Sequence, residues 1–170
     1  MQTSIRFIEE TDLKRIAQLA NDRDIAEMTA RLPYPYTISD AQTWFDYVAH
    51  TELEHVFAIC SGKELIGVIG LVLEPEHKRA ELGFWLGKSY WNQGHASAAA
   101  QIMVGYAFST LGVTKVYARC FGANNNSKRV LEKNGFVLEG QLKQHYIRMG
   151  TVQDVCYYGL QKADYEISAI

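Results

Sequence analysis

The chain has 170 residues, enough for one domain with a substantial hydrophobic core. Hydrophobic residues make up 48% of it, which excludes a disordered chain. Seventeen Lys and Arg against 19 Asp and Glu give a formal net charge of −2, so we expect no nucleic-acid partner. The sequence has no run of 18 apolar residues and no basic segment leading into an apolar stretch, so we expect neither a membrane partner nor a secretory signal.

The first half of the chain is predicted to hold one short strand, residues 5–8, followed by helices. Thr11 can cap the first helix through its hydroxyl, and a second short helix is expected over residues 24–30. Two prolines exclude regular helix from residues 32–36. Ser39 then opens another helix, and a glutamine three residues later completes a capping box.

From residue 55 the apolar period falls to two, which predicts strands. Residues 55–60 and 65–73 form a hairpin, and residues 79–86 extend it into an antiparallel meander. Residues 115–121 are the next strand, and it runs parallel to residues 79–86 because a helix connects the two. A short helix follows and ends at Asn134.

The chain closes with a hairpin of residues 136–148 and 152–160. Cys60, Cys120 and Cys156 lie in apolar strand-like segments, and none has a C-x-x-C partner. We therefore expect them to be reduced core residues of a cytoplasmic protein, and we expect no metal site.

The stretch around which the chain is organised is residues 80–111, where a strand, a turn-rich loop and a long apolar helix follow one another. The first turn of a helix carries unpaired N–H groups and the positive end of the helix dipole. Gly94 stands at this point without a Cβ that would keep an anion away. We therefore predict that residues 91–97 cradle a phosphorylated ligand; the alternative is a loop that only needs a positive φ at Gly94. Neither a Walker A loop nor a G-x-G-x-x-G fingerprint is present.

Residues 80–100, AELGFWLGKSYWNQGHASAAA, resemble the coenzyme A-binding segment of the GNAT superfamily of N-acetyltransferases, and most closely its RimJ/RimL-like branch. The superfamily pattern R/Q-x-x-G-x-G/A reads W-N-Q-G-H-A at residues 91–96, with Trp91 in place of the usual Arg or Gln. Residues 123–136 resemble the signature N-x-x-S-x-R-V-L-E-K-x-G-F, and residues 32–37, LPYPYT, are also similar to this branch. These matches span nearly the whole chain.

The resemblance implies one acetyltransferase domain over residues 1–170 with an α+β fold. The expected architecture is a mixed, mostly antiparallel, twisted sheet of about seven strands, with helices on both faces and one splayed parallel strand pair. Gly83 is where we expect a bulge that helps to part this pair; a glycine that merely avoids a neighbouring helix is the alternative.

The resemblance also implies acetyl-CoA as co-substrate. The cofactor-binding residues expected from it are Phe84, Trp85, Leu86, Trp91, Asn92, Gln93, Gly94, His95, Ala96, Ser97, Asn124 and Ser127. Lys128, Arg129 and Lys133 follow this set and are candidates for the 3′-phosphate, with a solvated helix face as the alternative for them.

The implied reaction is direct attack of a primary amine on the thioester within a ternary complex. Glu81 is the expected base, acting directly or through water, and an ion pair with Arg79 or Arg119 is the competing interpretation. Ser127 is expected near the leaving thiol, although a serine at this point can also cap the helix. His145 is a second candidate base.

For the acceptor, Tyr34 and Tyr146 are expected to line the binding site, with Tyr36 and Trp44 as further candidates. The expected acceptor is either the N-terminus of a ribosomal protein or a small-molecule amine. A homodimer is one assembly that we consider for the chain. Two alternatives remain open: transfer from another acyl-CoA, and a non-catalytic CoA-binding sensor or interaction module.

Overall fold

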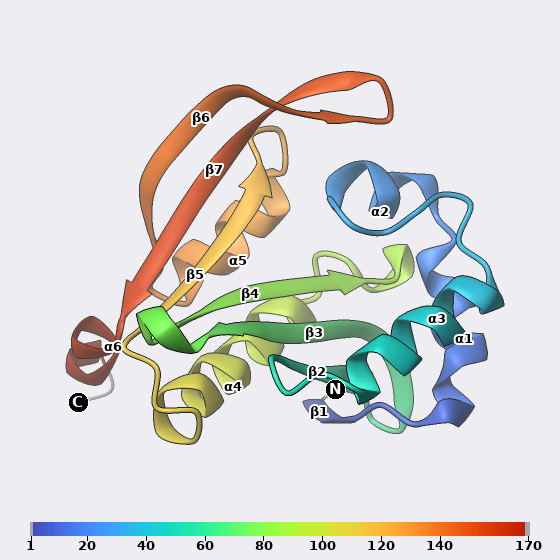
Figure 1. The fold of residues 1–170 in the computed structure, drawn as a ribbon, viewed down its shortest axis with the longest axis horizontal. Coiled ribbons are helices and arrows are strands. Elements are labelled where there is room, and N and C mark those ends of the chain that lie inside the picture. Colours follow the sequence, from blue (N-terminus) through green and yellow to red (C-terminus); the bar gives the residue numbers. More distant parts are fainter. Residues whose placement is uncertain (1, 169–170) are drawn as a thin grey trace.

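A computed structural model describes residues 2–168. It contains a seven-stranded sheet in the order β1-β2-β3-β4-β5-β7-β6 (Figure 1). The strands are β1 (Thr3–Phe7), β2 (Glu54–Ser61), β3 (Glu64–Glu74), β4 (Arg79–Leu86), β5 (Lys115–Phe121), β6 (Val137–Arg148) and β7 (Thr151–Gln161). The helices are α1 (Leu13–Ala20), α2 (Arg23–Met28), α3 (Ile38–Ala49), α4 (His95–Ser109), α5 (Asn125–Lys133) and α6 (Lys162–Ser168), with short 3-10 turns η1 (Glu10–Asp12), η2 (Pro75–His77) and η3 (Lys88–Tyr90).

The predicted splayed pair is present in the middle of the sheet. All neighbouring strands are antiparallel except β4 and β5, which run parallel. Their ladder joins only Arg79–Glu81 to Lys115–Tyr117. Beyond Glu81 the two strands diverge, as Figure 1 shows, and a wedge opens toward the ends of both strands.

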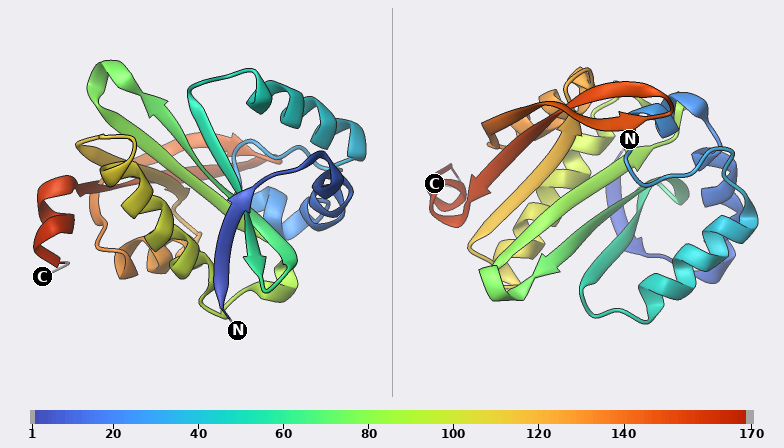
Figure 2. Two further views of the ribbon diagram at one scale, coloured as in Figure 1. Left: turned by 90° about the horizontal axis from the view of Figure 1, so that it is seen from below. Right: turned by 45° about the horizontal axis from the view of Figure 1, so that its top comes forward.

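Helices cover both faces of the sheet (Figure 2). On one face α4 and α5 bury a core that includes Ile69, Leu82, Met103 and Leu131. On the other face α1 and α3 bury a second cluster, which includes Ile16. Helices on both faces of a mostly antiparallel sheet confirm the predicted fold class.

Two predicted helix caps are wrong. Thr11 caps no helix, because it lies inside the 3-10 turn η1 that precedes α1. The Thr11 hydroxyl donates instead to the Glu9 carboxylate at 3.4 Å. Thr37, not Ser39, caps α3: its hydroxyl accepts from the Asp40 N–H at 3.2 Å, and the Asp40 carboxylate accepts from the Thr37 N–H at 2.7 Å. Thr37 has the extended backbone that a cap requires, whereas Ser39 lies inside the first turn.

The bulge predicted at Gly83 is also wrong. The β3–β4 ladder runs without a shift through the pair Gly70 and Gly83. A Cβ built on Gly83 would meet nothing within 4 Å, so this glycine avoids no helix of the described chain either. Gly83 instead leaves open space above the face of β4.

The three cysteines are free and buried, as predicted. Helix α6 was not predicted; it packs Tyr165 on Phe108, with ring centroids 5.1 Å apart. Within residues 2–168 no helix is long and apolar enough to cross a membrane.

Candidate active site

The loop that leads into α4 is folded back on the end of β4. The Trp91 indole N–H donates to the Leu86 carbonyl at 2.8 Å. Gly94 follows with φ +85° and caps α4 without a side chain. A Cβ at Gly94 would meet nothing within 4 Å, so the first turn of α4 faces open space. Gly94 therefore supplies a left-handed backbone and also leaves room in front of the unpaired amides.

A cavity of about 470 Å³ lies in front of these amides. Eleven of the twelve predicted cofactor-binding residues line it: Phe84, Trp85, Leu86, Trp91, Asn92, Gly94, His95, Ala96, Ser97, Asn124 and Ser127. The exception is Gln93, whose side-chain amide donates to the Ser89 carbonyl at 2.8 Å. The structure thus brings together residues from the β4 end, the head of α4 and the head of α5. We call this space the cofactor cavity.

Two side chains near the cofactor cavity are held elsewhere. His95 is 5% exposed, and its Nδ1 lies 2.9 Å from the Thr3 hydroxyl, so the imidazole fastens α4 to β1. Lys128 donates to the Gly122 carbonyl. Of the three basic residues predicted for the 3′-phosphate, Arg129 and Lys133 line the cavity. The positive groups available to an anion there are therefore those two cations and the helix amides.

Asn124, rather than Ser127, caps α5. The Asn124 side-chain carbonyl accepts from the Ser127 N–H at 3.1 Å, which places Ser127 inside the first turn. No hydrogen bond of the Ser127 hydroxyl is found with any residue that the structure describes. This hydroxyl is therefore left available to a ligand.

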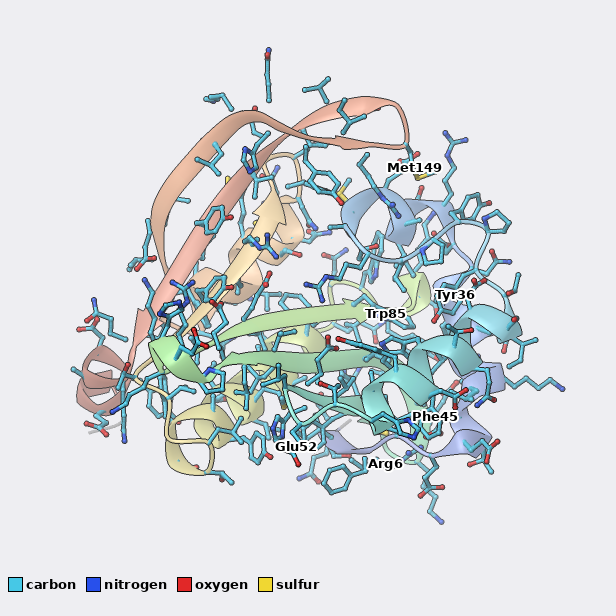
Figure 3. All side chains as sticks on the ribbon, in the orientation of Figure 1. Arg6, Tyr36, Phe45, Glu52, Trp85 and Met149 are labelled. Atoms are coloured by element: carbon cyan, nitrogen blue, oxygen red, sulfur yellow. The ribbon has the colours of Figure 1, made fainter. Side chains whose placement is uncertain are left out.

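A second, larger cavity of about 990 Å³ lies on the face of the sheet covered by α1 and α3. Its walls are the loop of residues 28–33, helix α3, the exposed face of β3–β5 and the β6–β7 hairpin. Figure 3 shows Tyr36 and Trp85, two of its lining residues, beside the end of β4. We call this space the acceptor groove.

The two cavities share part of their walls. The residues common to both are Met28, Thr29, Phe84, Trp85, Asn124 and Ser127. They lie where β4 has left its ladder with β5. A group bound in one cavity can therefore meet a group bound in the other between the two diverging strands.

Glu81 stands on the floor of the acceptor groove in an ion pair. Its carboxylate accepts from the Arg119 guanidinium at 2.7 and 2.9 Å, and the Tyr117 hydroxyl lies 3.5 Å away. Of the two predicted partners, Arg119 is the one observed, because Arg79 pairs with Glu74 at 2.7 Å. The hydrogen bond to Glu81 raises the pKa of Arg119, so the guanidinium stays charged.

The predicted acceptor residues divide between the groove and the surface. Tyr146 lines the groove, and its hydroxyl donates to the Ala30 carbonyl at 3.4 Å. His145 and Trp44 line it as well. Tyr34 lies outside its wall and is 46% exposed, whereas Tyr36 is buried in the wall, where burial raises its pKa to about 12.

The sequence shows no acidic cluster beyond Glu52 and Glu54, and Asp40 was missed as a carboxylate of the groove. Asp40 on α3 and Glu54 on β2 line it together with Glu81. The Tyr47 hydroxyl donates to Glu54 at 3.2 Å, and Arg31 lies 3.9 Å from the same carboxylate. No local spacing signals this set, because its members come from three elements that only the fold brings together.

Comparison with known proteins settles the family. Residues 3–137 match the family described as acetyltransferase (GNAT) domain. This chain belongs to the GNAT family. The membership predicted from the sequence is thereby confirmed.

Relatives of this GNAT protein include the uncharacterized N-acetyltransferase YoaA of Bacillus subtilis, 41% identical over 59% of this chain and 57% of that one. The ribosomal-protein-serine acetyltransferase of Escherichia coli is 36% identical over 61% of this chain and 58% of that one. Both alignments cover less than two thirds of the relative. The spermidine N-acetyltransferase of Vibrio cholerae, solved with CoA and spermine, superposes with a TM-score of 0.87 at 26% identity over 97% and 98% of the two chains. The predicted enzyme class, an acetyl-CoA-dependent N-acetyltransferase, is that of the family and of these relatives.

Proposed function

We propose that this GNAT protein transfers the acetyl group of acetyl-CoA directly to a primary amine bound in the acceptor groove. The observation that carries this proposal is the shared wall of the two cavities between β4 and β5. The cofactor cavity offers open amides and two cations to the phosphates of CoA. The wedge between the strands then has room for the pantetheine arm, with the thioester at the junction.

The chemistry follows from the groups around this junction. The neutral amine attacks the thioester carbonyl, a C–N bond forms, and the C–S bond breaks. Beyond Glu81 the edge of β4 that faces β5 has no ladder partner, so a backbone N–H near Phe84 can donate to the oxyanion. The Ser127 hydroxyl donates a proton to the departing thiolate and regains one from the amine nitrogen, which becomes cationic on attack and must lose this proton to give the neutral amide.

The amine arrives as an ammonium ion and must lose a proton before it attacks. Both oxygens of Glu81 accept from Arg119, but each carboxylate oxygen has a second lone pair that can hold water. We therefore assign Glu81 the role of a base that acts through a water molecule. His145, on the opposite wall, is the alternative base.

The acceptor that fits the groove is a protonated amine on a flexible chain. Asp40, Glu54 and Glu81 outnumber Arg31 and Arg119, so the groove is mildly anionic. Its tyrosines and Trp44 offer aromatic faces that attract ammonium groups. Similarity to relatives that are named for spermidine and for a ribosomal protein makes spermidine and a peptide beginning with serine the two acceptors to try first.

The direct test is release of free CoA thiol from acetyl-CoA in the presence of spermidine, the seryl peptide and a panel of other amines. We expect at least one amine to raise thiol release well above the hydrolysis background. CoA binding without turnover of any amine would instead indicate a sensor or interaction module. Faster turnover of succinyl-CoA than of acetyl-CoA would reassign the donor.

The role of Glu81 needs a separate control because its partner is also charged. Glu81→Gln is expected to lower kcat about 100-fold. The double variant Glu81→Arg, Arg119→Glu rebuilds the ion pair with its ends exchanged. If Glu81 is the base, the double variant stays inactive; restored activity would show that only the ion pair matters.

A further inference from the structure

Arg148, at the tip of the β6–β7 hairpin, binds both the end of α2 and the segment that follows it. The Arg148 Nε–H donates to the Ala26 carbonyl at 2.8 Å, and its Nη2 donates to the Leu32 carbonyl. Figures 1 and 3 show the hairpin tip, with Met149 labelled, above α2. We define the strap as residues 26–32, the end of α2 and the loop that follows it.

The strap forms one wall of both cavities. Met28 and Thr29 line the cofactor cavity and the acceptor groove alike, and Ala30–Leu32 line the groove. On the hairpin side the Tyr146 hydroxyl reaches Ala30 at 3.4 Å, and on the α5 side Asn124 donates to the Met28 carbonyl at 3.4 Å. Of these contacts, those of Arg148 alone bind both ends of the strap.

The two ends of α2 are secured by different means. At its start Asp22 accepts from the Asp24 and Ile25 N–H groups at 2.9 and 3.3 Å, and Lys88 pairs with Asp24. A helix of six residues is too short to be stable by itself, so its end also needs a partner. Within the described chain the Ala26 carbonyl otherwise accepts only a long bond, 3.4 Å, from the Thr29 N–H, so the guanidinium gives it a second donor and complements the helix dipole.

We infer that Arg148 is a positioning residue for the acceptor. It holds the strap against the hairpin and so fixes the outer wall of the groove at the point where the amine meets the thioester. The effect that we expect on the amine KM rests on the proposed function. Without Arg148 the strap loses its bonds to the hairpin at both ends, while the start of α2 and the head of α4 keep theirs.

The test compares Arg148→Met with Arg23→Met, a control at the start of α2, the helix whose end Arg148 binds; among the described residues Arg23 makes only an exposed pair with Glu27. Steady-state kinetics with spermidine and with a seryl peptide should show the amine KM of Arg148→Met raised about tenfold, with kcat changed less than about threefold. The CoA Kd should change less than about threefold. Arg148→Lys should recover part of the loss because an ammonium can reach one carbonyl, and Arg23→Met should match the wild type.

Amide hydrogen exchange supplies a readout that needs no amine. With CoA present, exchange over the strap should be at least about tenfold faster in Arg148→Met and unchanged over α4. Unchanged exchange or amine KM, or equal effects in Arg23→Met, would overturn the inference.

If Arg148→Met does not fold, Arg148→Lys and Tyr146→Phe are measured in the same way. If the protein acetylates no amine yet shows the exchange difference, the proposed function is refuted, whereas the conclusion that Arg148 holds the strap against the hairpin stands.

Discussion

Replacing Gly94 with valine tests whether the head of α4 is an anion site, because the structure separates the cost to folding from the cost to binding. Gly94 has φ +85°, and an added Cβ would meet no atom within 4 Å. The substitution therefore costs backbone strain and nothing from steric overlap, about 2 kcal/mol for a side chain in the left-handed region. For a domain of this size that loss lowers Tm by about 4–8 °C.

Gly112 provides the matched control. Its φ is +66°, an added Cβ again meets nothing within 4 Å, and it lines neither cavity. Gly112→Val should lower Tm by a similar amount. It should leave CoA affinity unchanged, since it lies away from the ligand.

The two variants should differ in CoA affinity. At Gly94 the new side chain points into the cofactor cavity and holds a phosphate away from the amides. Losing one charged hydrogen bond costs about 1.5–3 kcal/mol, so the CoA Kd should rise at least about tenfold. Isothermal titration with CoA and thermal unfolding measure the two quantities. Equal Tm losses with a Kd within twofold of wild type in both variants would refute the phosphate cradle.

Three further predictions concern catalysis, access and acid stability. Ser127→Ala should lower kcat about 100-fold at saturating acetyl-CoA while the CoA Kd stays within threefold; an unchanged kcat would remove Ser127 from the proton path. Gly83→Val should abolish acetylation yet retain CoA binding, because the valine side chain fills open space in the acceptor groove. Gly140 is the control, since it is a strand glycine with equally open surroundings that lines neither cavity, and Gly140→Val should retain activity. The Arg6 guanidinium donates two hydrogen bonds to the Asp12 carboxylate, at 2.7 and 2.8 Å, and lowers the pKa of Asp12. The charged carboxylate therefore stabilises the fold at pH values above its unfolded-state pKa of about 3.9. This stabilisation is lost as the pH falls through the lower pKa of the folded state. Urea unfolding should therefore show Asp12→Asn about 2 kcal/mol less stable than wild type at pH 7, with the difference shrinking as the pH falls below about 4; a difference that does not change with pH would contradict the assignment.

The parts of the fold that follow from apolar period were predictable from the sequence. The expected bounds of β4 and β5 match the observed ones, and so does the start of α4 after Gly94. The parallel pairing followed from the helix between the two strands. Helix α6 was missed because its anchor, Tyr165, is one aromatic residue without a periodic pattern around it.

Features set by backbone conformation or by distant contacts were not predictable. Thr37 and Ser39 are both chemically able to cap α3, and only the extended φ and ψ at Thr37 decide between them. The carboxylates of the groove come from α3, β2 and β4, so no spacing along the chain brings them together. Arg148 is separated by more than a hundred residues from the carbonyls that it binds.

The most direct measurement is a crystal structure of the protein with CoA. The account predicts the diphosphate on the backbone amides of residues 91–97 and the pantetheine arm between β4 and β5, with its sulfur beside Ser127. A diphosphate bound at another place, or β4 and β5 paired along their whole length in the complex, would contradict it.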